Sequence, residues 1–116
     1  MAVTRIIDLT PLEHLLRLAG PTGAPELVAA LIDDLKTTRA HLDAAWNGPD
    51  FAALRAKSHV LIGLAGTVGD TELHALAQRL NRGAQAQNPG DTVDITENIM
   101  TCLADLIAQL HDKKGA

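Results

Sequence analysis

Hydrophobic positions recur along this chain at three- and four-residue spacing, which is typical of amphipathic helices. No stretch alternates apolar and polar residues over more than a few positions, and short segments rich in Gly, Pro and Asp separate the periodic ones. The pattern predicts an all-α protein of five helices. Four long helices form an antiparallel (up-down) four-helix bundle, and a short additional N-terminal helix covers it as a lid.

The short first helix is predicted from its start and stop signals. Thr10 is the expected N-cap, Pro11 occupies the first helical position, and Glu13 follows the cap by three residues. The Gly20-Pro21 pair ends this helix after about three turns.

The second and third helices are both predicted to be long. The second begins near Pro25-Glu26 and stops at Gly48-Pro49, and the third runs from Asp50 to about Val68. Because its apolar residues share one side, the second helix is amphipathic. That apolar face consists of Leu27, Leu31, Leu35, Leu42 and Trp46.

The last two helices are separated by a predicted polar loop over Gln85–Gly90. Asp70 caps the fourth helix, and the fifth begins after Asp91 or Thr92. Cys102 lies on the apolar face of the fifth helix, which predicts a buried core residue and not a reactive thiol. The other members of that face are Ile95, Ile99, Leu103, Leu106 and Leu110.

Composition supports one small helical domain. The chain has 116 residues and a mass of 12.3 kDa, so we expect a single domain over residues 1–116. Hydrophobic residues make up 47% but aromatic residues only 2%, so Leu, Ala, Ile and Val must build the core. Its length and Met1 start lead us to expect a complete protein. Because the bundle closes its core within one chain, we also expect a monomer.

Charge and cysteine content narrow the possible partners. Ten Lys and Arg against fourteen Asp and Glu give a formal charge of −4, without a basic run interleaved with aromatics, which argues against nucleic acid. The uninterrupted apolar stretches are shorter than the roughly 20 residues that span a bilayer, and a signal pattern is missing. We expect a cytoplasmic protein without membrane association. The single cysteine excludes an internal disulfide and fits a reducing compartment.

One segment, residues 55–69, carries candidate chemistry. On a helical wheel His59 points away from the buried stripe, and Gly63 and Gly66 lie beside it on the outward face. Each glycine costs about 1 kcal/mol relative to alanine inside a helix, so close approach of another molecule would explain them. Tight packing of a neighbouring helix is the alternative, which the wheel disfavours. The buried stripe consists of Leu54, Leu61 and Val68.

The segment from His59 to Gly69 resembles the motif of the histidine-containing phosphotransfer (HPt) domain family. That motif is His, any residue, Leu, Lys, Gly, Ser, then small residues and a hydrophobic-Gly pair, and its spacing is preserved here. The likeness extends to the Asp8-Leu9-Thr10 start of the first helix and the Gly48-Pro49-Asp50 turn. The fourth helix, which ends in Leu80-Asn81, matches as well.

The resemblance implies a function in two-component signal transduction. In a multistep His-Asp phosphorelay, His59 would accept a phosphoryl group from a receiver-domain aspartate and pass it to another receiver. The partners would be response regulators, a hybrid histidine kinase, or both. The partner receiver would supply an acidic cluster and Mg²⁺, so this chain would need no metal or cofactor of its own. It would be a phosphocarrier and not an enzyme with independent turnover.

Two positions depart from the family motif. Ile62 stands where the family usually has a lysine, and Leu64 stands where a small hydroxyl residue is usual. The positive charge beside the phosphoryl group is therefore reduced. Ile62 instead enlarges an apolar patch, which together with Gly63 and Gly66 would form the receiver-docking surface.

Other side chains are candidates to support the phosphoryl group and the imidazole. Arg55, one turn before His59, is expected to compensate for the missing lysine. In the family a Gln or Glu of the fourth helix orients the imidazole; the matching residue here is Asn81, with Gln78 as the second candidate. Two further cations are weaker candidates for phosphoryl support, namely Lys57 and Arg82.

Three other interpretations stay open. His59 could be an exposed histidine without a role. The chain could be a non-phosphorylated adaptor or inhibitor that binds a receiver or a histidine kinase, for which Ile62 is the best argument. The third interpretation, a histidine-kinase dimerisation domain, is weakly supported, because the sequence after His59 lacks a Glu-x-x-Thr-Pro-like continuation.

The remaining histidines do not have the spacing of metal ligands, so we expect them to be surface or partly buried residues without a metal-binding role. They are His14, His41, His74 and His111.

Overall fold

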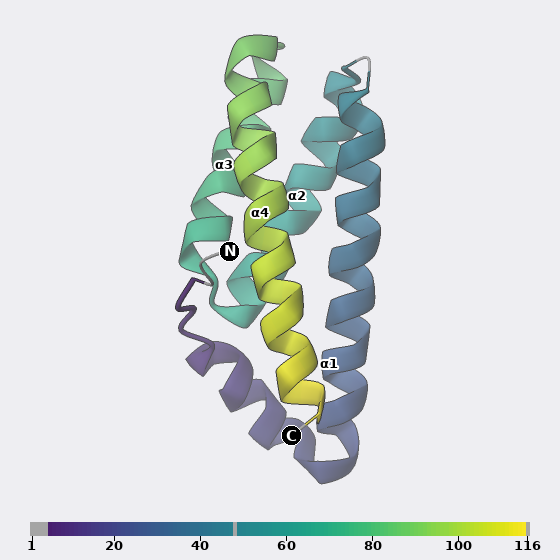
Figure 1. The fold of residues 1–116 in the computed structure, drawn as a ribbon, viewed down its shortest axis with the longest axis vertical. Coiled ribbons are helices and arrows are strands. Elements are labelled where there is room, and N and C mark those ends of the chain that lie inside the picture. The colour runs from purple at the N-terminus through teal and green to yellow at the C-terminus, as the bar shows by residue number, and fades with distance from the viewer. Residues whose placement is uncertain (1–4, 48, 116) are drawn as a thin grey trace.

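Four helices form an antiparallel bundle in the computed structural model, which describes residues 5–47 and 49–115. Neighbours in the chain pack side by side, and the last helix closes the bundle against the first (Figure 1). Both the all-α class and the up-down architecture are therefore confirmed. The helices are α1 (Thr10–Trp46), α2 (Phe51–Val68), α3 (Thr71–Gln85) and α4 (Pro89–Gly115).

The long helix α1 consists of two segments that meet at Gly20. The backbone of Gly20 has φ 79° and ψ 177°, a left-handed conformation that glycine adopts at little cost. The segment before Gly20, here called the N-terminal arm, runs diagonally across one end of the bundle (Figure 1) and is the predicted extra helix. The predicted start of the second segment near Pro25-Glu26 is wrong, because helix follows Gly20 directly. Pro21 needs no amide hydrogen in a first turn, so the break costs little.

The start of α1 also differs from the prediction. Thr10 is not the N-cap: Leu9 precedes the first turn and accepts a hydrogen bond from the Glu13 amide at 2.8 Å. Asp8 organises this turn, since its carboxylate accepts hydrogen bonds from the backbone amide and the hydroxyl of Thr10. These bonds hold the pKa of Asp8 below its usual range.

The predicted bounds of α2 and the predicted start of α3 are confirmed, whereas α3 continues past the predicted end at Leu80-Asn81 to Gln85. The side chain of Asp50 accepts a hydrogen bond from the Ala53 amide at 3.0 Å, which is the expected N-cap of α2. Asp70 caps α3 in the same way, through the Leu73 amide at 3.1 Å. Gly69 ends α2 with φ 94°, and a Cβ atom there would lie 2.7 Å from the Pro11 ring. The preceding helix α1 ends at Trp46, and Gly48 lies outside the described residues.

The connection between α3 and α4 is shorter than predicted. Gln87 adopts a left-handed backbone with φ 52°, and the Asn88 amide donates to the carbonyl of Gly83 at 3.1 Å. This turn closes the end of α3, so α4 begins at Pro89, a residue that suits a first helical position. The predicted loop over Gln85–Gly90 and the start after Asp91 or Thr92 are therefore wrong by a few residues.

The core is aliphatic, as the composition predicts. Cys102 is 4% exposed inside it, and burial raises the pKa of its thiol although the charge of Arg5 opposes this shift. The predicted core role of Cys102 is confirmed. Leu27 and Trp46 only partly reach the core. The largest fully buried side chains include Leu12, Leu35, Leu42, Leu54, Leu61, Leu73, Leu80, Ile99, Leu103, Leu106 and Leu110.

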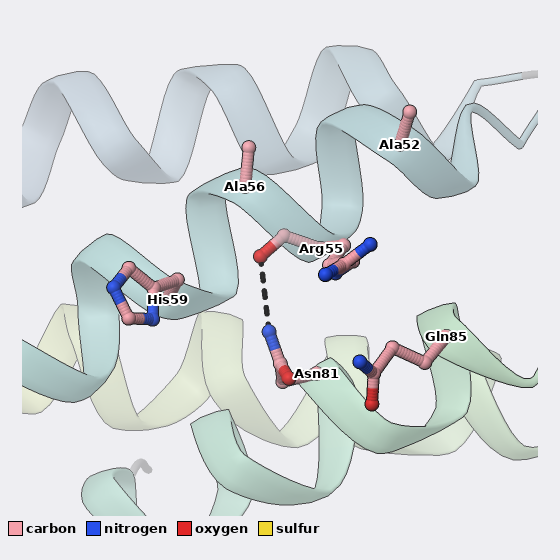
Figure 2. A pocket seen from close by; sticks show the side chains of 6 residues that line it. All are labelled: Ala52, Arg55, Ala56, His59, Asn81 and Gln85. Atoms are coloured by element: carbon pink, nitrogen blue, oxygen red, sulfur yellow. Dashed lines mark hydrogen bonds between the residues drawn. The ribbon is translucent and has the colours of Figure 1, made fainter.

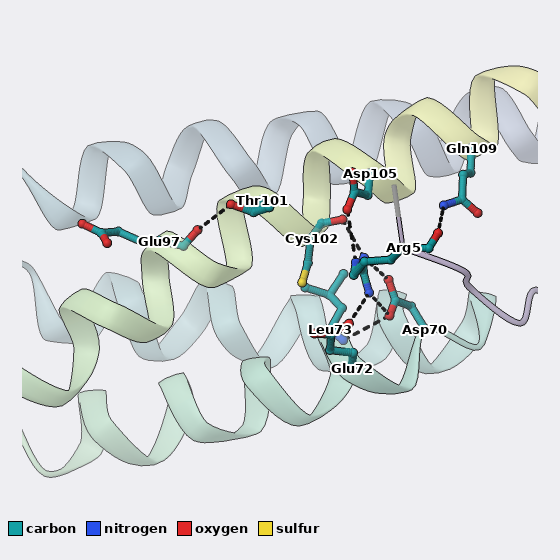
Figure 3. A network of polar contacts seen from close by, with 9 residues as sticks. All are labelled: Arg5, Asp70, Glu72, Leu73, Glu97, Thr101, Cys102, Asp105 and Gln109. Atoms are coloured by element: carbon teal, nitrogen blue, oxygen red, sulfur yellow. Dashed lines mark hydrogen bonds and ion pairs between the residues drawn. The ribbon is translucent and has the colours of Figure 1, made fainter. Parts of the chain in front are cut away.

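Arg5 fastens the segment before α1 to the bundle, a contact that the sequence did not reveal (Figure 3). Its guanidinium donates to both carboxylate oxygens of Asp70 at 2.9 Å and to the carbonyl of Cys102 at 2.8 Å. Glu72 lies at 3.1 Å and Asp105 at 3.4 Å from the same group. Although burial opposes the charge, these partners raise the pKa of Arg5. Arg5 therefore links the start of α3 to α4.

One helix of the described residues, Thr10–Trp46, is long and apolar enough to span a membrane by length and composition alone. Only 17% of its most apolar 18-residue window is buried in the bundle. The helix bends at Gly20, and its longer segment packs against α2 and α4. The expectation of a protein without membrane association stays a prediction.

Candidate functional site

His59 lies on the outward side of α2, where the helical wheel places it. Its side chain is exposed, while Leu54, Leu61 and Val68 of the same helix are buried. Within the described residues the imidazole has no hydrogen-bond or ion-pair partner. Its ring nitrogens are therefore open to a molecule that approaches from solvent.

An open hollow between α2 and α3 adjoins His59 (Figure 2). Gln85 of α3 faces it across from α2, a residue that sequence reasoning missed because no family motif reaches it. The small side chains on the α2 side keep the hollow wide enough for an incoming group. The lining residues are Ala52, Arg55, Ala56, His59, Asn81 and Gln85.

Asn81 joins α3 to the turn of α2 that carries His59. Its side-chain amide donates to the carbonyl of Arg55 and to the hydroxyl of Ser58, both at 3.1 Å. Ser58 is fully buried and donates to the same carbonyl at 2.9 Å. In Figure 2 Asn81 points to Arg55 and not to the imidazole. Gln78 is exposed and lies outside the hollow, so neither amide holds the imidazole in this structure.

We expect Asn81→Ala to destabilise the domain by about 1–2 kcal/mol, because it leaves the buried Ser58 hydroxyl and a backbone carbonyl with fewer partners. The free energy of unfolding from urea denaturation measures this loss. Gln78→Ala, on the exposed side of the same helix, is the matched control and should change stability by less than about 0.5 kcal/mol. Equal values for the two variants would contradict the bridging role of Asn81.

Of the three candidate cations, only Arg55 shares the hollow with His59. Its guanidinium lies on the Gln85 side of the hollow in Figure 2. Lys57 is half-buried and does not line the hollow. Arg82 lines a different hollow, between α3 and α4. Arg55 is therefore the cation best placed to reach a group bound to His59.

Packing among the described residues does not explain the two glycines beside His59. A Cβ atom on Gly63 would meet no atom of the described residues within 4 Å, and one on Gly66 would meet the His74 ring at 3.7 Å, an ordinary contact. Ile62 is half-buried and packs partly against the core. At Gly63 and Gly66 the outward side of α2 therefore has no side chains that project from the helix, which leaves room for a partner surface.

A family model decides the class of this protein. The model of the Hpt domain matches residues 26–113, which include His59, Arg55 and Asn81. The chain belongs to the Hpt domain family. Hpt domains are phosphocarrier modules that interact with receiver domains, so membership implies histidine phosphotransfer in phosphorelay signalling.

The match also has limits. Arg5 and the N-terminal arm lie before residue 26 and outside the matched region. Comparison with curated proteins and with solved structures gives no match.

Among the described residues, no group of three or more His, Cys, Asp or Glu side chains is arranged to hold a metal ion. The particular contacts of this Hpt domain must therefore be argued from its own side chains.

Proposed function

We propose that His59 is the phosphoacceptor of this Hpt domain in a multistep His-Asp phosphorelay. The observation that carries the proposal is the exposed, unpartnered imidazole of His59 on an open side of α2, inside the region that the family model matches. His59 takes the phosphoryl group from the aspartate of one receiver and gives it to the aspartate of another. The protein acts as a cytoplasmic monomer.

The transfer exchanges one bond for another. An unprotonated imidazole nitrogen attacks the phosphorus of the receiver's aspartyl phosphate, and the N–P bond forms as the O–P bond to the carboxylate breaks. The aspartate leaves with the bonding electron pair, and the other ring nitrogen keeps its proton. The acidic cluster of the receiver would hold Mg²⁺, and that ion would neutralise charge on the phosphoryl oxygens. Transfer to the second receiver reverses these steps.

The smooth side of α2 gives the receiver access to the histidine. Gly63 presents only backbone and Gly66 adds no side chain, so a receiver surface can come close to His59. Ile62, which replaces the usual lysine, offers an apolar contact to that surface. We propose Ile62, Gly63 and Gly66 as the centre of the receiver-docking surface.

Phosphoryl transfer from a panel of phosphorylated receiver domains tests the proposal. We expect the purified protein to gain one acid-labile phosphoryl group, and fragmentation of the labelled peptide should place it on His59. Binding of receivers without any label would favour the adaptor alternative, for which the missing lysine at Ile62 is the argument. In that case Ile62→Lys is the next variant. Light scattering measures the molar mass in solution, which should be that of a monomer.

Arg55→Ala should slow transfer or shorten the phosphohistidine lifetime by about three- to tenfold, because a nearby guanidinium stabilises the charge of the phosphoryl group. Single-turnover transfer and the decay of the labelled protein measure the two effects. Arg17→Ala, which removes an exposed arginine from the N-terminal arm, is the control. Unchanged transfer and lifetime in Arg55→Ala would exclude this role.

A further inference from the structure

The turn of α2 that precedes His59 is held from α3 by hydrogen bonds that meet at one backbone oxygen. The side-chain amide of Asn81 and the hydroxyl of Ser58 both donate to the carbonyl of Arg55, at 3.1 Å and 2.9 Å. The same Asn81 amide also donates to the Ser58 hydroxyl at 3.1 Å. We call these three groups the α2–α3 clamp: the Asn81 amide, the Ser58 hydroxyl and the Arg55 carbonyl.

The clamped carbonyl is the one on which the backbone of His59 depends. In an α-helix each carbonyl accepts the amide of the residue four positions later, so the Arg55 carbonyl is the helical partner of the His59 amide. Ser58 is fully buried, and successive residues are rotated by about 100° around a helix, so the burial of Ser58 fixes the direction in which His59 faces. The α2–α3 clamp therefore sets the position and the rotation of the turn that presents the imidazole.

The donors of Asn81 are fully used by this clamp. A side-chain amide has two N–H groups, and Ser58 and the Arg55 carbonyl accept from the amide of Asn81. Although Asn81 lines the hollow beside His59, its amide nitrogen points to the Arg55 carbonyl in Figure 2. Asn81 therefore acts on the imidazole through the backbone of α2 and not by direct contact.

We propose that Asn81 and Ser58 are positioning residues for phosphoryl transfer, which act through the Arg55 carbonyl. The inference deepens the proposed function and rests on it. Attack on the aspartyl phosphate requires the imidazole nitrogen to lie in line with the bond that breaks, so a small displacement of this turn slows the chemical step. Arg55 supplies both the clamped carbonyl and the cation of the hollow, so the clamp also fixes the point from which its guanidinium extends.

The test measures single-turnover transfer over a range of concentrations of phosphorylated receiver, at a temperature at which every variant is folded. Asn81→Ala removes the donor from α3, and Asn81→Asp keeps the size of the side chain but replaces the donor with an acceptor. Ile99→Val is the control, because it removes one buried methylene group from α4 and lowers stability without touching the α2–α3 clamp. Hydrogen exchange of the α2 amides is measured on the same variants.

Both Asn81 variants should react about tenfold more slowly than wild type at saturating receiver, with the half-saturating concentration changed by less than about twofold. Ser58→Ala keeps the direct contact of Asn81 with the Arg55 carbonyl, so transfer should slow by only about threefold. Ile99→Val should stay within about twofold of wild type. In the Asn81 variants, exchange should rise selectively at the His59 amide and the amides next to it.

Three results would overturn the inference: Asn81 variants that react as fast as Ile99→Val, a loss that appears only in the half-saturating concentration, or exchange that rises uniformly along α2. Absence of labelling in wild type would instead refute the proposed function, and hydrogen exchange would still show whether the α2–α3 clamp holds the turn of His59. If Asn81→Ala does not fold, Asn81→Asp and Ser58→Ala provide the comparison.

Discussion

Replacing His59 with Gln is expected to abolish acid-labile labelling by every phosphorylated receiver. Glutamine is polar and close in size but offers no nucleophilic nitrogen, so no N–P bond can form. Because the His59 side chain is exposed and has no partner among the described residues, the fold should be kept, with a change in stability below about 0.5 kcal/mol. A loss of label therefore reports on chemistry and not on unfolding.

The matched control for this experiment is His74→Gln. His74 lies on α3 with its ring near Gly66, beside the same outward surface, but in a different hollow from His59. Label should fall by at least about 100-fold in His59→Gln and stay within about twofold of wild type in His74→Gln. Label that persists in His59→Gln and disappears in His74→Gln would move the phosphoacceptor to α3.

The features that the sequence predicts well are those fixed by local chemistry. Asp50 and Asp70 are N-caps because their carboxylates reach amides three residues ahead, a relation visible in the sequence alone. The outward position of His59 and the burial of Cys102 follow from helical spacing, which the bundle preserves. The candidate phosphoacceptor could therefore be named before its surroundings were known.

The features that the sequence misses depend on contacts distant in the chain or on several weak signals at once. Arg5 and Asp70 are 65 residues apart in the sequence, so no local sequence pattern predicts their ion pair. The family resemblance predicts Asn81 near the imidazole, but its short side-chain amide instead donates to the backbone carbonyl of Arg55 and to the hydroxyl of Ser58. The helical segments that begin at Pro21 and Pro89 start earlier than the sequence predicts, because a proline fits the first turn of a helix as well as it marks a break.

Asp70→Ala is expected to lower the free energy of unfolding by about 3 kcal/mol or more, a large part of the roughly 5–15 kcal/mol that stabilises a small domain. Asp70 is 1% exposed and serves two purposes at once. It caps α3 through the Leu73 amide, and each of its two oxygens accepts a hydrogen bond from the Arg5 guanidinium. Without the carboxylate, Arg5 stays half-buried with Asp105 and Glu72 as poorer partners.

The control is Asp50→Ala, which removes an N-cap of the same kind from α2 but no buried ion pair, and should cost only about 1 kcal/mol. Urea unfolding of both variants, and of Asp70→Asn, separates the cap from the charge, because asparagine keeps a capping oxygen. A double-mutant cycle that combines Asp70→Ala with Arg5→Ala measures the interaction free energy between the two side chains. If Asp70→Ala cost no more than Asp50→Ala, the Arg5 contact would contribute nothing to stability. A larger loss would mean that residues before the matched region help to hold α3, and with it Asn81, against the helix that carries His59.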